Sequence, residues 1–135
     1  MKKLIINTSK TEEGYSASCD ILAGWVVAYS GDFKGFVEYV KESIDFYEEC
    51  ATEDGNPIPD VLLGDYEILY RFDIQSLLWH YNKFFSYASL EHITGINQRQ
   101  LWHYAVGKSK PRPKQKEKII TSLNRLGAEL IALSV

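Results

Sequence analysis

Polar and basic side chains that can recognise the bases of DNA lie close together near residue 100. Gln98 and Arg99 follow Asn97, and His103 lies about one helical turn further on. A glutamine amide can form two hydrogen bonds with adenine, and an arginine guanidinium can do the same with guanine. Asn97 and Gln100 have side chains that can reach a phosphate or a base edge. This cluster predicts contact with the major groove of duplex DNA.

A run of cations follows the cluster. Six of the eleven residues from 108 to 118 are Lys or Arg: Lys108, Lys110, Arg112, Lys114, Lys116 and Lys118. Cations along a DNA backbone displace counterions and give affinity without sequence selectivity. The alternative is a charged loop that meets only solvent. Because the run adjoins the cluster near residue 100, we favour contact with phosphates.

Two short helices joined by a tight turn are expected to hold the cluster. Ser86 can cap the first helix, in which Leu90 and Ile93 have core spacing. Gly95 can end that helix in the left-handed conformation, which glycine adopts without steric cost. Ile96 then follows as a buried turn residue. A helix, a tight turn and a second helix define a helix-turn-helix.

The second helix is expected to begin after Asn97 and to end at Gly107. Asn97 can cap it, with Gln100 at the third helical position completing a capping box. Leu101 and Tyr104 would face inward. The residues predicted on the outward side, toward the major groove, are Gln98, Arg99 and His103. Trp102 is expected outward or half-exposed, where it could pack on sugar.

One further helix is expected on each side of this motif. Asp73 can cap a helix that runs through Leu77, Leu78, Trp79 and Tyr81 to Phe84 and Phe85, and a last helix runs from about Lys114 to the C-terminus. The last helix carries an apolar stripe, Ile119, Leu123, Leu126, Leu130 and Leu133, which is too short for a coiled coil. The stripe either packs on the domain's own helices or forms a homodimer seam. Because most helix-turn-helix proteins bind DNA as dimers, we expect a homodimer or a higher homo-oligomer.

The charge of the chain is divided between its two halves. Residues 1–70 contain five Lys or Arg and 14 Asp or Glu, a net charge of −9. Residues 71–135 contain ten Lys or Arg and four Asp or Glu, a net charge of +6. Two surfaces of opposite charge suggest different partners. The basic half suits phosphates, whereas the acidic half would repel nucleic acid and attract a basic protein.

The acidic half is expected to form a small sheet with one helix laid across it. Three antiparallel strands and a later fourth strand are predicted at Leu4–Asn7, Tyr15–Cys19, Trp25–Tyr29 and Tyr66–Phe72. Asp32 can cap a helix that extends to Cys50, and residues 51–60 read as a loop. The order β-β-β-α-β gives an α+β fold, with domains at residues 1–72 and 73–135.

Acidic side chains cover the outer face of the helix that begins after Asp32. This is either a solvated face or a docking face for a cationic partner. The residues that would contact such a partner are Glu38, Glu42, Asp45 and Glu49, beside Glu48.

The sequence offers little for catalysis. A nuclease of the RNase H type needs metal-binding carboxylates on its central sheet, and Leu4–Asn7 contains none. Neither a GxGxxG nor a GKS/T motif is present. The three histidines lie far apart, and Cys19 and Cys50 form no CxxC pair. We therefore expect no enzymatic activity, metal or cofactor. Without a long apolar run, we expect a cytoplasmic protein that does not contact membranes.

Several segments, taken in order, resemble the HicB-type antitoxins of type II toxin–antitoxin systems. Glu13–Gly24 is similar to the GYSA-x-CPDLPG signature of that family. Asp32–Cys50 and Gly55–Pro59 look like its helix and the G-x-P-I-P loop that follows. Leu90–Gly107 resembles the helix-turn-helix carried by one branch of the family. The resemblance covers nearly the whole chain.

Three residues depart from the family pattern. Asp20 and Ala23 stand where the signature usually has proline. Glu91 stands where a helix-turn-helix usually has a small residue, so we expect its side chain to bend outward.

The resemblance implies a two-faced binding protein. Its N-terminal domain would be a degenerate RNase H-like fold that masks a small, basic, mRNA-cleaving HicA-type toxin. Its C-terminal domain would bind the operator of its own operon and repress it. Two other functions remain open. One is a stand-alone transcriptional regulator whose N-terminal domain senses something else or only dimerises, and the other is a metal-dependent nuclease.

Overall fold

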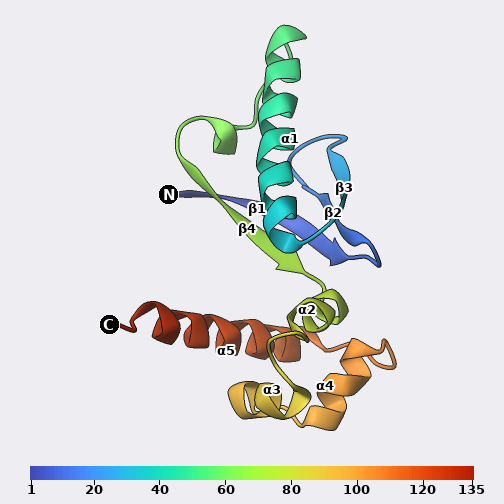
Figure 1. Cartoon of the computed structure of the whole chain (residues 1–135). Coiled ribbons are helices and arrows are strands. Elements are labelled where there is room, and N and C mark those ends of the chain that lie inside the picture. Colours follow the sequence, from blue (N-terminus) through green and yellow to red (C-terminus); the bar gives the residue numbers. More distant parts are fainter. The chain divides into compact units, whose positions relative to one another are not determined.

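Four strands form one sheet in the order β3-β2-β1-β4 in the computed structural model, which describes residues 1–135 (Figure 1). The strands are β1 (Lys2–Lys10), β2 (Gly14–Ser18), β3 (Val26–Ser30) and β4 (Tyr66–Phe72). β2 pairs antiparallel with β1 and β3, whereas β4 pairs parallel with β1. The four predicted strands are confirmed. β1 is longer than predicted because the polar residues at both ends also pair with neighbouring strands, and of these only Thr8 is buried.

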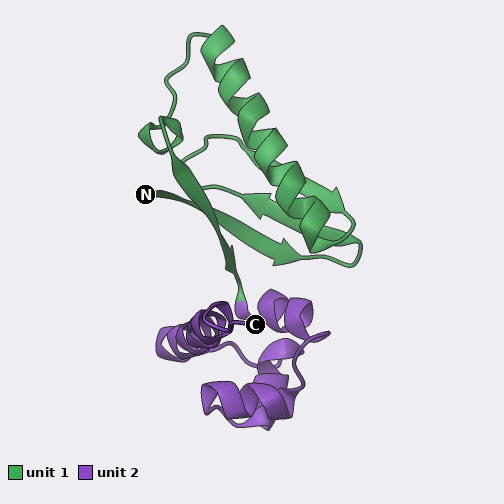
Figure 2. Ribbon diagram, turned by 60° about the vertical axis from the view of Figure 1, so that its left-hand side comes forward, with its two compact units in different colours: residues 1–73 green, residues 74–135 purple.

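Helix α1 (Phe33–Glu53) covers one face of this sheet (Figure 2). Its N-cap is Asp32, whose carboxylate accepts a hydrogen bond from the Gly35 N–H at 2.9 Å, as predicted. Phe36 is fully buried, and its ring centroid lies 5.1 Å from that of Tyr15. Burial of a side chain of this size contributes about 1.5–3 kcal/mol. The helix therefore holds the sheet mainly through its apolar stripe.

The predicted end of α1 at Cys50 was wrong. The helix continues to Glu53, because Ala51 lies on the same buried face as Ile44 and extends the apolar stripe. The chain then makes one turn of 3-10 helix, Asp60–Leu62, inside and just beyond the predicted loop. The Lys2 ammonium ties this turn to β1 by donating to the carbonyl oxygens of Asp60 and Leu63.

Asp20 takes part in a polar network on the sheet. Its carboxylate accepts a hydrogen bond from Asn7 at 2.8 Å and lies 3.6 Å from the Arg71 guanidinium. Arg71 also donates to the Asn7 side-chain oxygen at 3.1 Å. A proline at position 20 could not make these contacts.

The chain divides into two compact units, unit 1 (Met1–Asp73) and unit 2 (Ile74–Val135), coloured separately in Figure 2. Unit 2 contains only helices: α2 (Ile74–Tyr81), α3 (Tyr87–Thr94), α4 (Gln98–Ala105) and α5 (Pro113–Ile131). Its core includes Leu78, Leu90, Leu101 and Ile119, each at most 1% exposed. The chain as a whole is α+β, as predicted. No helix combines the length and the apolar character needed to cross a membrane.

Two expectations for unit 2 need correction. α2 ends at Tyr81 rather than Phe85, since the chain turns there and leaves Phe84 66% exposed. The last helix ends at Ile131 rather than at the C-terminus, and its apolar stripe is still half-buried at Leu123 and Leu126. Ile119 is buried, whereas Leu130 is 55% and Leu133 75% exposed.

Candidate nucleic-acid interface

The turn between α3 and α4 has the local structure that its sequence predicts. The Ser86 hydroxyl accepts a hydrogen bond from the Ser89 N–H at 3.1 Å and begins α3. Gly95 ends α3 with φ of 74°, in the left-handed region. Ile96 is 4% exposed, and its N–H donates to the Thr94 hydroxyl at 3.1 Å. These contacts fix the direction in which α4 leaves the turn.

Two side chains occupy the N-terminus of α4. The Asn97 side-chain oxygen accepts from the Arg99 N–H at 2.8 Å, so the predicted cap is confirmed. The Glu91 carboxylate accepts from the Gln98 N–H at 2.9 Å. We expected the Glu91 side chain to bend outward. Instead it reaches across the turn to α4. A negative charge is favourable there because the N-terminus is the positive end of the helix dipole.

The predicted capping box at Gln100 was wrong. The Gln100 amide instead donates to the Ser109 hydroxyl at 3.2 Å and is half-buried. Glu91 serves a different group, the Gln98 N–H, and Gln100 ties the following loop to α4 instead of reaching back to the Asn97 N–H. Gln100 is thus less available to a phosphate or a base than its position in the sequence suggested.

The outer face of α4 is the polar one. Gln98 and Arg99 are exposed, and Trp102 is 44% exposed, whereas Leu101 is fully buried. His103 is only half-exposed, with its ring centroid 5.5 Å from that of Trp102. Asn97, also exposed, adds its amide group to this face. The accessible residues among those predicted to contact bases are therefore concentrated at the N-terminus and in the first turn of α4.

The basic run is split between a loop and a helix. Lys108, Lys110 and Arg112 lie in the loop after α4, and Lys114, Lys116 and Lys118 lie in the first turns of α5. All are exposed except Lys116, which is half-buried. A Cβ added to Gly95 would lie 3.6 Å from the Lys118 nitrogen, so this cation sits beside the α3–α4 turn. The turn and the start of α5 therefore belong to one neighbourhood.

The N-terminus of α5 has neither a capping side chain nor an acid. Arg112 is the N-cap residue and makes no side-chain cap, Pro113 follows it, and the first turn contains no Asp or Glu. Cations at this positive end of a helix oppose stability by about 0.3–1 kcal/mol each. Free N–H groups together with lysines suit an incoming anion such as a phosphate.

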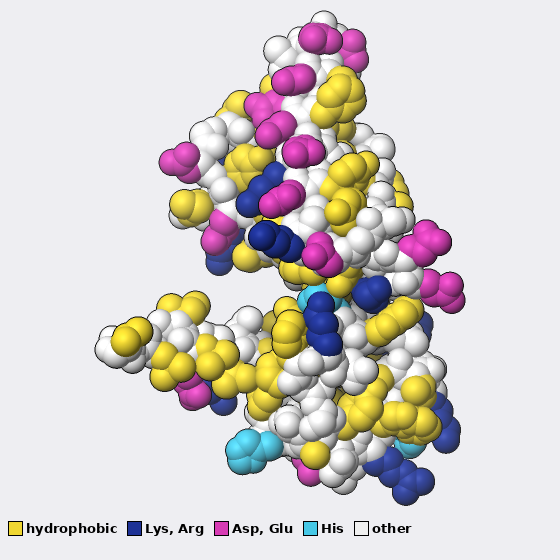
Figure 3. Space-filling view, viewed as in Figure 1, with side chains coloured by type: hydrophobic (Ala, Val, Ile, Leu, Met, Phe, Trp, Pro, Cys, Tyr) yellow, Lys and Arg dark blue, Asp and Glu magenta, His cyan; other side chains and the backbone are white.

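The predicted acidic residues of unit 1 line one exposed side of α1. Glu38, Glu42, Asp45 and Glu49 are all exposed, and acidic side chains follow the helix in Figure 3. Two exposed aromatic residues border these acids, Phe46 (65% exposed) and Tyr39 (38% exposed). Neither was predicted from the sequence. Their separation of seven residues, off the buried stripe, was the signal that could have revealed them.

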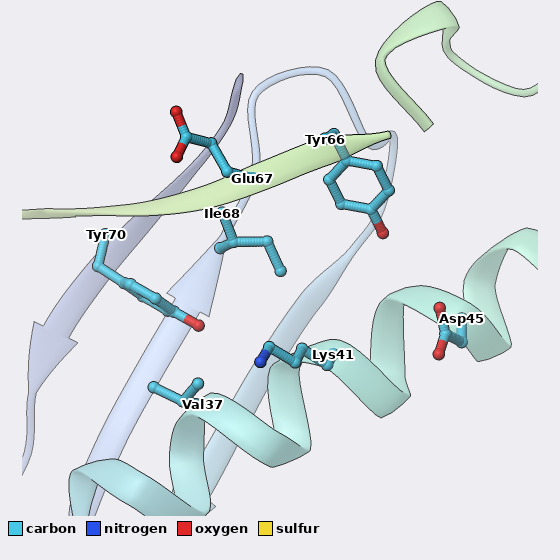
Figure 4. A pocket seen from close by; sticks show the side chains of 7 residues that line it. All are labelled: Val37, Lys41, Asp45, Tyr66, Glu67, Ile68 and Tyr70. Carbon is cyan, nitrogen blue, oxygen red and sulfur yellow. The ribbon is translucent and has the colours of Figure 1, made fainter. Parts of the chain in front are cut away.

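A groove of about 500 Å³ lies between α1 and β4 and was not predicted (Figure 4). The Tyr70 hydroxyl is buried without a hydrogen-bond partner, and burial raises the pKa of Tyr70. Burial raises the pKa of Tyr66 too, with a further contribution from the negative charge of Asp45 and then of Glu48. Lys41 and Asp45 project toward the groove from successive turns of α1. The groove is thus lined by side chains of both charges and by two phenols.

No group of three or more His, Cys, Asp or Glu side chains is placed to hold a metal ion. Cys19 is buried and Cys50 half-buried, and both are free thiols. Comparison of the chain with protein-family models, with curated proteins and with solved structures finds no match.

Proposed function

We propose that this chain is a HicB-type antitoxin that binds its own operator through unit 2 and a small basic HicA-type toxin through unit 1. The observation that carries the proposal is the first turn of α4. There Asn97, Gln98 and Arg99 are exposed together at the start of a helix, and the buried Ile96 anchors the turn before it. We interpret α3, the turn and α4 as a helix-turn-helix.

The dimensions of α4 support insertion into duplex DNA. An α-helix with its side chains is about 10–12 Å across, and the major groove, about 12 Å wide, admits it. Arg99 would pair with a guanine and Gln98 with an adenine. The basic run, on the loop after α4 and the first turns of α5, would hold the backbone on either side. DNA-binding residues in this proposal are Asn97, Gln98, Arg99, Lys108, Lys110, Arg112 and Lys114, with smaller roles for Gln100 and His103.

The acidic side of α1 supports a cationic protein partner. Four exposed carboxylates on one helix would raise the rate of encounter with a basic toxin. Phe46 and Tyr39 add apolar area at the border of these acids, and buried aromatics often supply most of the binding free energy. The β-β-β-α-β order and a β1 without carboxylates support a degenerate RNase H-like unit that binds without cleaving RNA.

A second candidate function is a stand-alone transcriptional regulator that senses a small molecule. The groove between α1 and β4 favours it, since its volume lies within the range of ligand sites. We prefer the antitoxin because a basic toxin would give the acidic face of α1 a partner of opposite charge.

DNA binding is tested by fluorescence anisotropy of the full chain on the DNA upstream of its own reading frame. We expect tighter binding to that fragment than to a scrambled one of equal length, at several salt concentrations. Equal affinity for both would remove the repressor role.

Toxin binding is tested by co-purification with the small basic protein encoded beside the chain. Reversing Glu38 and Glu42 to lysine should weaken capture, since it replaces attraction by repulsion. The matched control reverses Glu12 and Asp65, which are exposed outside α1 and undergo the same change of charge. Equal losses in both pairs would indicate only a net-charge effect, and unaltered capture would exclude this face of α1.

A further inference from the structure

β3 is an unprotected edge of the sheet. β2 is its only neighbour, and its five residues, Val26–Ser30, include no charge and no proline. Edge strands usually carry lysines, prolines or bulges that prevent pairing with another chain. β4, at the other edge, carries Glu67 and Arg71. The two edges therefore differ in how readily they accept a further strand.

The neighbouring strand holds β3 firmly in position. A Cβ on Gly14 of β2 would lie 1.9 Å from the Tyr29 carbonyl oxygen, so only glycine allows this approach. On the helix-covered face, the Tyr29 ring lies 5.4 Å from the Tyr39 ring of α1. β3 is thus held from two sides while its outer row of N–H and C=O groups stays free for another strand.

The chain itself has no strand that could pair with β3. All four strands already lie in the one sheet, and unit 2 contains only helices. A further strand must therefore come from another molecule. Every solution of this protein contains one such strand at equal concentration, namely β3 of a second copy.

We infer that β3 pairs antiparallel with β3 of a second copy, joining two four-stranded sheets across a two-fold axis. The register that pairs all five residues is centred on Ala28, which meets its own counterpart. Val27 then faces Tyr29, and Val26 faces Ser30, with no like charges opposed. Valine beside an aromatic residue is a favourable cross-strand pair. The 73% exposed Val26 side chain would also gain a covering neighbour.

The test uses charge at the two-fold axis. Ala28 is exposed, so the A28K and A28E substitutions should leave the fold intact. We expect the unaltered chain to be a dimer by light scattering coupled to gel filtration, and each variant alone to be a monomer, with about half the mass. Like charges directly opposite each other in a ladder repel, whereas opposite charges attract. An equimolar mixture of the A28K and A28E chains should therefore recover the dimer.

The matched control lies on the other edge. L69K places a lysine on β4, where Leu69 is 39% exposed, and should leave the dimer intact. A dimer that persists in A28K, or that is lost in L69K, would overturn the inference. So would an unaltered chain that is monomeric at every concentration, or a dimer that dissociates only when Leu130 of α5 and Leu133, which follows that helix, become aspartate. None of these measurements needs DNA or toxin, so their outcome does not depend on whether the proposed function is correct.

Discussion

The N-termini of α4 and α5 are built in opposite ways. At α4, the Asn97 amide and the Glu91 carboxylate accept the first N–H groups. At α5, no side chain caps the helix, and lysines occupy the positive end of the dipole. At α4, side chains of the chain itself accept hydrogen bonds from the first N–H groups, so the exposed side chains there are free to contact base edges. The N-terminus of α5 has no acidic side chain of its own, so it suits a phosphate. The contrast indicates a division between reading and holding in the proposed complex.

The largest expected effect is on the discrimination between DNA sequences. Arg99→Ala should reduce discrimination between operator and random DNA by about 1–3 kcal/mol, because a bidentate contact with guanine is lost. Competition binding with both fragments measures it. Arg125→Ala on the far part of α5 is the matched control and should change neither affinity. Equal losses on both fragments would assign Arg99 to the backbone and break the contrast.

The next largest effect is on the sequence-independent affinity for DNA. Replacing Lys110 and Lys114 by alanine should weaken binding to all sequences alike. The slope of log affinity against log salt should become shallower by about 0.9 for each phosphate contact removed. Titrations at several salt concentrations give this slope. If it stays the same, the basic run does not lie on the DNA.

A smaller effect concerns the cap that Glu91 provides. Glu91→Ala should lower the free energy of unfolding by about 0.5–2 kcal/mol, the usual range for a lost N-terminal cap. Glu91→Gln keeps an acceptor oxygen and should cost less. Both changes remove a negative charge from the proposed DNA face and should tighten non-specific binding. Urea unfolding and anisotropy measure the two quantities, and an unchanged stability in Glu91→Ala would show that water replaces the cap.

The smallest expected effect is on stability, and it tests the N-terminus of α5 against that of α4. Lys114→Glu should raise the free energy of unfolding by about 0.3–1 kcal/mol, because an acid suits the first turn of a helix. The same change should weaken DNA binding. A variant that gains stability and keeps its affinity would show that this helix end does not meet phosphate.

Local chemistry made much of unit 2 predictable. Gly95, Asn97 and Ser86 act within a few residues of themselves, so their roles as helix ends follow from the sequence. Glu91 does not, since its contact with Gln98 crosses a turn and depends on how α3 and α4 pack. The misassigned Gln100 has a similar cause, because local spacing could not show that its amide meets Ser109 in the loop after α4.

In unit 1, alternation predicted the strands but not the exposed features between elements. The apolar stripe of α1 was visible in the sequence, whereas Phe46 was hidden among acids and assigned no role. The groove beside Tyr70 could not be predicted, because it depends on the distance between α1 and β4. The sequence pattern thus identifies elements and their buried faces, and the spaces between elements require coordinates.

The parallel pairing of β1 with β4 has a consequence for biosynthesis. Lys2 is aligned with Tyr66 and Thr8 with Phe72, so the central strand gains its second neighbour only after more than sixty further residues have been made. Contacts so distant along the chain slow folding. While the ribosome is still translating the region before Phe72, β1 has one bare side that can pair with a neighbouring nascent chain. Crowding of ribosomes on one message should therefore be the condition under which this protein aggregates most readily.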